Sequence, residues 1–239
     1  MDGRAALITG GSSGIGLAIA RALGQDGYCL TVSARRPEKL EEAVKGLTDE
    51  GIEAQAVPAN MADEEGIKTV VSSHRDKYGR LDVLINNAGV GIGSPIADAE
   101  TKKLDMQLDV NLRGVYLTLR ECIPMLKEAG AEHGKALVVN TASIAGVQGQ
   151  AWLAAYSATK AGVIGLSQAA HGELAGDGIQ VTAFAPGFVD TPMTDWTKGE
   201  IPPEDMIRPE DLAEAVRFLL RTSPACIVPE MRFIRPGDS

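Results

Sequence analysis

Few residues of this chain are suited to a disulfide framework or a metal site. Its 239 residues include three cysteines, Cys29, Cys122 and Cys226, and three histidines, all far apart in the sequence. Dispersed cysteines in odd number, without a Cys-x-x-Cys pair, supply neither a disulfide scaffold nor the ligand spacing of a zinc site. We therefore expect no metal site, and free thiols of the kind found in a reducing compartment.

Long apolar runs and an excess of basic residues are missing as well. The uncharged stretch 136–159 contains Asn140, Gln148 and Gln150, so it is a poor membrane span. The first residues place an acid beside the first base and lack the apolar core of a signal peptide. With 32 acidic and 23 basic residues, the net charge of −9 disfavours nucleic acid and anionic membranes as partners. We expect a cytoplasmic protein.

What the sequence does contain is an alternation of short β-branched runs and helical patterns from end to end. The expected strands are 5–9, 28–34, 52–57, 82–86, 135–143, 179–185 and 231–236. The expected helices are 15–25, 37–50, 63–78, 103–129 (interrupted near Asn111), 153–175 and 210–221. This order predicts an α/β fold with a doubly wound, mostly parallel, Rossmann-like sheet of about seven strands and helices on both faces. No linker or repeat divides the chain, so residues 1–239 are expected to form a single domain, with a short substrate lid at about 192–208.

A glycine-rich turn joins the first expected strand to the first expected helix. It reads Thr9-Gly10-Gly11-Ser12-Ser13-Gly14-Ile15-Gly16. Glycine allows a tight turn and a close approach of phosphate to the backbone, and a helix N-terminus supplies unpaired N–H groups. The spacing differs from the dinucleotide fingerprint Gly-x-Gly-x-x-Gly. By itself, the turn is compatible with a pyrophosphate site and also with a tight turn that binds nothing.

Two arginines, Arg35 and Arg36, follow the second expected strand. An acidic residue at this place in a nucleotide-binding fold holds the ribose hydroxyls of NAD, whereas arginine pairs with the 2′-phosphate of NADP. Ala34 contributes no carboxylate that would repel that phosphate. The pair therefore favours NADP(H) over NAD(H). The alternative is that both arginines only flank the start of a solvated helix, where positive charge is unfavourable.

Tyr156 and Lys160 are four residues apart and share one face of an expected helix. A phenol titrates near pH ~10, so it needs a nearby positive charge to exchange protons at neutral pH. Lys160 is placed to lower the pKa of Tyr156. Taken alone, the pair is better explained as a surface contact. However, Ser143 and the run Asn86-Asn87-Ala88-Gly89 stand at the carboxyl ends of expected strands, and we expect them at the same edge of the sheet.

Together these motifs resemble the short, single-domain branch of the short-chain dehydrogenase/reductase family. The matching elements, in family order, are Thr9-x-x-x-x-Gly14-x-Gly16, Asn86-Asn87-Ala88-Gly89, Asn111, Ser143, Tyr156-x-x-x-Lys160 and Pro186-Gly187 through Thr191. The resemblance implies an oxidoreductase that transfers hydride between a nicotinamide cofactor and a carbonyl or secondary alcohol. It also implies a homodimer or homotetramer formed through the helices expected at about 103–129 and 153–175.

The resemblance further implies a role for each matching residue. Four residues would be catalytic. Tyr156 would be the general acid/base and Ser143 would polarise the carbonyl. Lys160 would hold the nicotinamide ribose and lower the Tyr156 pKa, and Asn111 would position a water. The residues expected to bind the cofactor, besides Tyr156 and Lys160, are Gly10, Ser12, Ser13, Gly14, Ile15, Gly16, Arg35, Arg36, Asn60, Asn87, Ala88, Gly89, Pro186, Gly187, Val189 and Thr191.

Three features depart from the family pattern. Asn60 stands where an Asp usually binds the adenine amino group, although its side-chain oxygen can accept the same hydrogen bond. Ser13 stands where many NADP(H)-using members have a basic residue, so the cofactor preference depends mainly on the two arginines. The C-terminal segment 228–236 lacks the Gly-Gly ending common in 3-oxoacyl-thioester reductases.

The segments expected to form the substrate pocket are largely apolar, which suits a small-molecule ketone, although any one of them could instead pack the core or a subunit interface. They are 90–95, 144–150, Trp152, Leu153 and 188–196. We therefore expect a carbonyl reductase, reversible as an alcohol dehydrogenase. A 3-oxoacyl-thioester reductase is the narrower alternative, for which the lid offers only Lys198 and Arg208 to bind an acidic carrier protein. A non-catalytic NADP(H)-sensing protein is an alternative of another class, disfavoured by the complete catalytic set.

Overall fold

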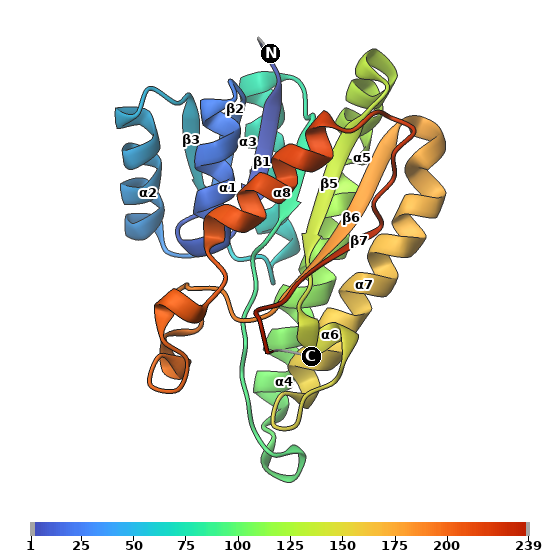
Figure 1. Ribbon diagram of the computed structural model, residues 1–239. Helices are drawn as coiled ribbons and strands as arrows, with labels where there is room; N and C mark the ends of the chain where they lie inside the picture. Colours follow the sequence, from blue (N-terminus) through green and yellow to red (C-terminus); the bar gives the residue numbers. More distant parts are fainter. Residues whose placement is uncertain (1–2, 238–239) are drawn as a thin grey trace.

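The computed structural model describes residues 3–237, and its centre is a parallel β-sheet (Figure 1). Within these residues the strands are β1 (Ala5–Thr9), β2 (Cys29–Ala34), β3 (Ala54–Pro58), β4 (Val83–Asn86), β5 (Ala136–Thr141), β6 (Ile179–Pro186) and β7 (Glu230–Phe233). The strand order is β3-β2-β1-β4-β5-β6-β7, and every neighbouring pair is parallel. The strand order reverses between β1 and β4, where ligands bind in doubly wound folds. The predicted fold class is confirmed.

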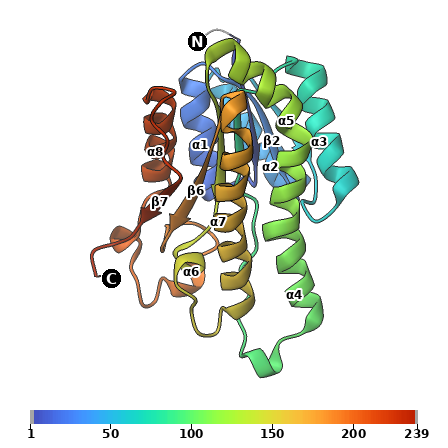
Figure 2. The same ribbon diagram turned by 90° about the vertical axis from the view of Figure 1, so that its right-hand side faces the viewer.

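Helices cover both faces of the sheet, and each face has its own hydrophobic core (Figures 1 and 2). On one face lie α1 (Gly14–Gln25), α2 (Pro37–Asp49) and α8 (Pro209–Arg221); on the other lie α3 (Glu64–Tyr78), α5 (Gly114–His133) and α7 (Ala154–Leu174). Successive strand residues alternate between the cores, because side chains along a strand point to opposite faces. Ile8 of β1 and Ile85 of β4 belong to the core on the side of α1. Their neighbours Leu7 and Leu84 belong to the core on the side of α3.

The helix expected over 103–129 is interrupted where the sequence predicted it. It consists of α4 (Thr101–Leu108), a π-helical turn (Asp109–Arg113) and α5. π-Helical turns are rare and are often found near functional sites. Here the turn holds Asn111, which is fully buried. Its side-chain oxygen accepts from the Val90 backbone N–H at 2.8 Å, and its amide donates to the Val90 carbonyl at 2.8 Å. The interruption therefore fixes the loop that follows β4.

A short helix, α6 (Ile144–Val147), was not predicted. The expected strand 135–143 is wrong in its last two residues, because β5 ends at Thr141 and Ser143 caps α6. The Ser143 hydroxyl accepts from the Ala145 backbone N–H at 3.2 Å, as N-capping serines do. α6 lies against α7 so closely that a Cβ on Gly146 would come within 2.5 Å of the Lys160 backbone. This short helix therefore holds Ser143 next to α7.

The segment 192–208 leaves the sheet after β6 and returns to it before α8, at the lower left in Figure 1. Its ends are joined, since the Asp190 N–H donates to the Ile207 carbonyl at 2.9 Å and the Ile207 N–H donates to the Phe188 carbonyl at 3.0 Å. Between them lie two short 3₁₀ turns, Asp195–Thr197 and Pro203–Asp205. The expected opening and closing of this segment as a lid stays a prediction.

The connections at the amino ends of the strands differ in length from those at the carboxyl ends. At the amino ends of the strands, α3 and α5 stop at left-handed glycines, Gly79 (φ 68°) and Gly134 (φ 71°), which end helices without strain. From there the chain passes into β4 and β5 within a few residues. The longer connections lie at the carboxyl ends of the strands, at the lower edge in Figure 1. Among residues 3–237, no helix combines the length and apolar character needed to cross a membrane.

Candidate active site

A cavity of about 900 Å³ lies at the carboxyl ends of the central strands. It brings together most of the residues that the sequence predicted for catalysis and cofactor binding. Those that line it are Gly10, Ser12, Ser13, Gly14, Ile15, Arg35, Arg36, Asn60, Asn87, Ala88, Gly89, Ser143, Tyr156, Lys160, Pro186, Gly187, Val189 and Thr191. The predicted residues Gly16 and Asn111 are not in the lining; they lie behind it and support it.

The glycine-rich turn is packed tightly against the end of β4. At Gly10, with φ of 67°, an added Cβ would lie 2.7 Å from the Ala88 Cα. At Gly16, an added Cβ would lie 2.5 Å from the Gly10 carbonyl oxygen. The Asn87 amide donates to that same carbonyl at 3.1 Å. The side chain of Ser13, the residue before α1, makes no capping hydrogen bond. The turn therefore presents the N-terminus of α1 to the cavity, where an anion would be favourable.

Arg35 and Arg36 lie at the far end of the cavity, after β2. Both side chains are exposed, and within residues 3–237 neither forms an ion pair with an acidic residue. Ala34 precedes them and adds no negative charge. Two cationic side chains that form no ion pair among residues 3–237 therefore stand at this end, where an anionic group could bind.

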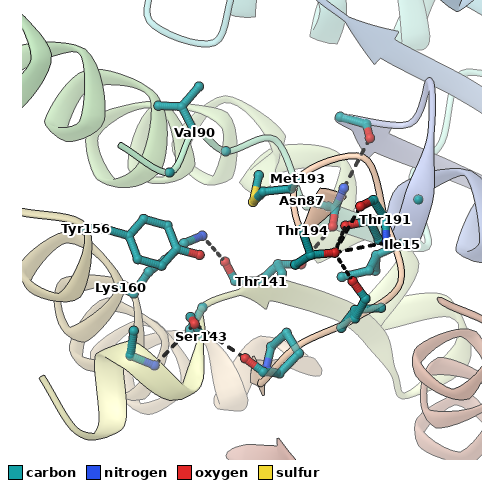
Figure 3. A pocket seen from close by; sticks show the side chains of 18 of the residues that line it. Ile15, Asn87, Val90, Thr141, Ser143, Tyr156, Lys160, Thr191, Met193 and Thr194 are labelled. Carbon is teal, nitrogen blue, oxygen red and sulfur yellow. Dashed lines mark hydrogen bonds between the residues drawn. The ribbon is translucent and has the colours of Figure 1, made fainter. Parts of the chain in front are cut away.

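α7 presents Tyr156 and Lys160 one turn apart, and both point into the cavity beside Ser143 (Figure 3). The Lys160 ammonium is 5.6 Å from the centre of the Tyr156 ring. It is almost fully buried and donates to the Thr141 carbonyl at 2.7 Å. The Ser143 hydroxyl is a hydrogen-bond partner of the Tyr156 side chain and also donates to the Pro186 carbonyl at 3.4 Å. Three polar side chains, Ser143 at the start of α6 and Tyr156 and Lys160 on α7, therefore meet beside the end of β5.

The expected lowering of the Tyr156 pKa by Lys160 is wrong for the protein by itself. Burial of the phenol raises its pKa, and this outweighs the hydrogen bond from Ser143, which lowers it. Burial also lowers the pKa of the Lys160 ammonium to about 8. Lys160 does not offset this rise in the Tyr156 pKa, because its ammonium is directed to the Thr141 carbonyl and lies over the face of the phenol ring. Tyr156 is consequently a neutral phenol at pH 7, ready to donate its proton.

Asn111 lies beside this group and acts on it through its neighbours. Its amide donates to the Thr159 hydroxyl at 3.2 Å in addition to its two bonds with Val90. The residue is thus tied both to the loop after β4 and to α7, which carries Tyr156 and Lys160. Its expected part in positioning a water stays a prediction.

Several lining residues were missed in the sequence. Thr141 supplies the carbonyl that binds Lys160, and Arg232 and Ile234 reach the cavity from β7 and the residues after it. Backbone carbonyls carry no sequence signal. Nor does the sequence show that β7 pairs alongside β6, which places residues near the C-terminus at the site.

The substrate end of the cavity is apolar, as expected. Of the predicted segments, Ile92 and Pro95 do not line it, but most of the others do. Near Ser143, Tyr156 and Lys160, this end is lined by Val147, Gln148, Gln150, Trp152, Leu153, Phe188, Met193 and Trp196. Such a lining suits a ligand with a hydrophobic body and one polar group near Tyr156.

The basic residues of the 192–208 segment are engaged by acidic neighbours. Lys198 pairs with Asp190 at 3.0 Å and with Asp195 at 2.8 Å. Arg208 pairs with Asp211 at 2.6 Å. Neither side chain is free to bind an acidic partner without losing these pairs.

Comparison with known proteins agrees with this geometry. The family model described as short chain dehydrogenase matches residues 4–200. A 3-oxoacyl-[acyl-carrier-protein] reductase from Staphylococcus aureus strain Mu50 is 36% identical over 228 residues, covering 90% of this chain and 90% of that protein.

Solved structures give the same picture. A variant of actinorhodin polyketide ketoreductase with NADPH has a TM-score of 0.87 at 34% identity, covering 96% of this chain and 95% of that one. A 3-ketoacyl-(acyl-carrier-protein) reductase from Brucella melitensis, complexed with NADH, has a TM-score of 0.87 at 32% identity, covering 97% of each chain. Both forms of the nicotinamide cofactor thus occur among similar structures.

Proposed function

The chain belongs to the short-chain dehydrogenase/reductase family, an oxidoreductase family that acts on carbonyl or alcohol groups with a nicotinamide cofactor, and we propose that it is an NADP(H)-dependent carbonyl reductase. One observation carries the proposal. Ser143, Tyr156 and Lys160 share a single cavity with a glycine-rich turn at one side and, at its end, two arginines that form no ion pair within the described residues 3–237.

The residues of the cavity fit a dinucleotide. The close packing of Gly10 and Gly16 leaves the N-terminus of α1 open to a pyrophosphate, since a Cβ at either position would collide with the backbone. When bound, the cofactor supplies or accepts the hydride. We assign the pyrophosphate to the turn Gly10–Gly16 and the 2′-phosphate to Arg35 and Arg36. The adenine and its ribose are assigned to Asn60, Asn87, Ala88 and Gly89. The nicotinamide amide is assigned to Pro186, Gly187, Val189 and Thr191.

The catalytic side chains would act on the oxygen of the substrate. Ser143 donates a hydrogen bond to the carbonyl oxygen, which makes the carbon more electrophilic. Tyr156 gives its proton to that oxygen as negative charge develops there. Lys160 would hold the nicotinamide ribose beside the phenol. Since burial raises the pKa of Tyr156, the neutral acid form that reduction requires is the one present at pH 7.

The proposal is tested by following the oxidation of NADPH and of NADH with a panel of ketones, aldehydes and 3-oxoacyl thioesters. Reduction of ketones with NADPH in preference to NADH is the expected result. Equal or better use of NADH would overturn the cofactor assignment. Binding of NADPH without turnover of any carbonyl would instead support a non-catalytic sensor of NADP(H).

Removing either arginine should weaken the binding of NADPH far more than that of NADH. Arg35→Ala and Arg36→Ala are each expected to raise the Kd of NADPH by about 10- to 100-fold, because a charge-assisted hydrogen bond to phosphate is worth roughly 1.5–3 kcal/mol. The Kd of NADH, which lacks the 2′-phosphate, should change by less than about threefold. Isothermal titration calorimetry with both cofactors measures this.

A matched control for these variants is Lys39→Ala. It removes one positive charge from the first turns of α2, but Lys39 is not in the cavity lining. It should leave both dissociation constants unchanged. If the arginine variants weakened NADH and NADPH equally, the arginines would not discriminate between the cofactors.

The 3-oxoacyl-thioester reductase is retained as a second candidate, because similar proteins carry that name. Against it stand the ion pairs of Lys198 and Arg208, which occupy the basic groups that an acidic carrier protein would need. A kcat/KM higher for a carrier-bound 3-oxoacyl thioester than for any free ketone would favour this candidate.

We also propose that the chain forms a homodimer or homotetramer through α4, α5 and α7. An apolar groove between these helices is lined by Leu108, Leu112, Tyr116 and Leu166, among others. Tyr116 is half exposed although its ring is large. A second copy of the same helices would cover this surface.

A further inference from the structure

Both tryptophans of the chain lie at the substrate end of the cavity. Trp152 comes from the loop between α6 and α7, and Trp196 comes from the 192–208 segment. Their ring centres are 5.9 Å apart, with an angle of 57° between the planes, so the indoles contact each other. Their exposed fractions are 51% and 64%, which is high for tryptophan. We call this pair the tryptophan wall.

The backbone holds Trp152 in an unfavourable conformation. Its φ is 68°, and it is the only residue other than glycine with positive φ in the part of the chain that the structure describes. Bulky side chains rarely adopt this region, and such outliers cluster at ligand sites. The Trp152 carbonyl accepts from the Ser94 N–H at 2.8 Å. At Gly93, an added Cβ would lie 2.3 Å from the Trp152 indole. The loop after β4 therefore fixes the indole in place.

The surroundings of the wall are apolar. Met193, Leu153, Val147 and Phe188 line the same end of the cavity, and Met193 is 49% exposed. An exposed apolar surface of this kind, inside a cavity, is typical of a site for a hydrophobic ligand.

Three basic side chains, two in the 192–208 segment and one on β7, form ion pairs with carboxylates. Lys198 and Arg208 pair with the carboxylates described above, and Arg232 pairs with Glu230. A ligand held here by its phosphate, as a thioester on a carrier or on coenzyme A would be, would compete with these carboxylates for the basic side chains. A neutral ligand would not.

We infer that the tryptophan wall binds a flat aromatic or fused-ring portion of a neutral ketone, while Ser143 and Tyr156 hold its carbonyl. This inference rests on the proposed function, which it deepens by naming the class of substrate. Aromatic rings prefer tilted or offset contacts with other rings and gain from these beyond the area they bury. A flexible alkyl chain would gain only the buried area.

The inference is tested with two ketones of equal carbon number, 2-tetralone, which has a fused aromatic ring, and 2-decanone, which has a linear chain. The wild type is expected to reduce 2-tetralone with the higher kcat/KM. Trp152→Gly and Trp196→Ala should each lower the ratio of the two kcat/KM values by roughly three- to tenfold, as expected from the loss of one aromatic contact. Glycine suits the positive φ at residue 152, so that variant should fold.

The control variant is Phe218→Ala. Phe218, on α8, is 51% exposed like Trp152, but it is not in the cavity lining. Its removal should leave the ratio unchanged. A wild type that prefers 2-decanone, or tryptophan variants with an unchanged ratio, would overturn the inference while leaving the carbonyl reductase intact.

Binding can also be measured without turnover, because all tryptophan fluorescence of the protein arises from the wall. 2-Naphthol, a flat aromatic alcohol without a ketone, should quench this fluorescence, and calorimetry should show its affinity falling in both variants. If 2-naphthol bound in this way but no ketone were reduced, the wall would be supported and the proposed function would fail. If it bound wild type and variants equally, the inference would fail.

Discussion

Replacing Tyr156 by phenylalanine should lower kcat/KM for ketone reduction by about 10²- to 10⁴-fold, the range typical of the loss of a general acid. The ring that contacts Lys160 remains, so only the proton donor is removed. The Kd of NADPH should stay within about threefold of wild type, since the phosphate-binding groups are untouched. Steady-state kinetics and calorimetry on the same preparation measure both quantities.

The control for this variant is Tyr116→Phe, which removes an exposed phenol on α5 outside the cavity lining. Its turnover should equal that of the wild type. Near-normal turnover of Tyr156→Phe would show that another group supplies the proton. Loss of NADPH binding would show instead that Tyr156 has a structural part in forming the cofactor site.

Replacing Lys160 by methionine should abolish most turnover and stabilise the protein at pH 7. The ammonium is almost fully buried with one neutral carbonyl as its hydrogen-bond acceptor, and burial lowers its pKa to about 8. Against an ordinary value of about 10.4, that shift corresponds to a cost of the order of 3 kcal/mol for keeping the charge in the folded state. Methionine removes this cost but leaves the Thr141 carbonyl without its donor, so a net gain of about 1–2 kcal/mol in the free energy of unfolding is expected.

The dependence on pH distinguishes this explanation from a general packing effect. Below pH 8 both the folded and the unfolded wild type bind the proton, so the full cost is present. Between about 8 and 10.4 the unfolded state binds more protons than the folded state, and the stability contributed by this group rises with pH. Urea unfolding at pH 7 and at a pH between the two values should therefore show the advantage of the variant shrinking.

Lys39→Met, at an exposed site on α2, is the matched control and should show neither effect. A Lys160→Met protein less stable than the wild type at pH 7 would mean that the bond to the Thr141 carbonyl outweighs the cost of burial. A stabilised but inactive variant would show that the chain retains a costly charge for its chemistry.

Much of the fold was open to prediction because its signals are local. Short apolar runs such as 5–9 and 179–185 identify buried strands, and their alternation with helical patterns, together with the crossover rule, indicates a parallel sheet. The residues expected on the cofactor side could also be selected from the sequence, because glycines, arginines and the Tyr156–Lys160 pair stand at recognisable spacings along the chain; their binding of a cofactor stays a prediction. The cavity lining contains nearly all of them.

What escaped prediction depends on contacts distant in sequence. The short helix α6 begins at a serine cap that also reads as the end of a strand, and only its packing on α7 decides between the two. The raised pKa of Tyr156 depends on burial of its phenol, and the Lys160 ammonium is held by the Thr141 carbonyl. The meeting of Trp152 with Trp196 depends on how two loops fold over the same cavity.

The glycine-ended turns at Gly79 and Gly134 have a consequence for how this enzyme can change over time. They allow short connections at the amino ends of the strands, and neither glycine lines the cavity. The opposite rim carries the long segments whose residues determine which molecule is accepted. Insertions, deletions and substitutions in those segments can therefore change the specificity while the sheet and its helices keep the same shape.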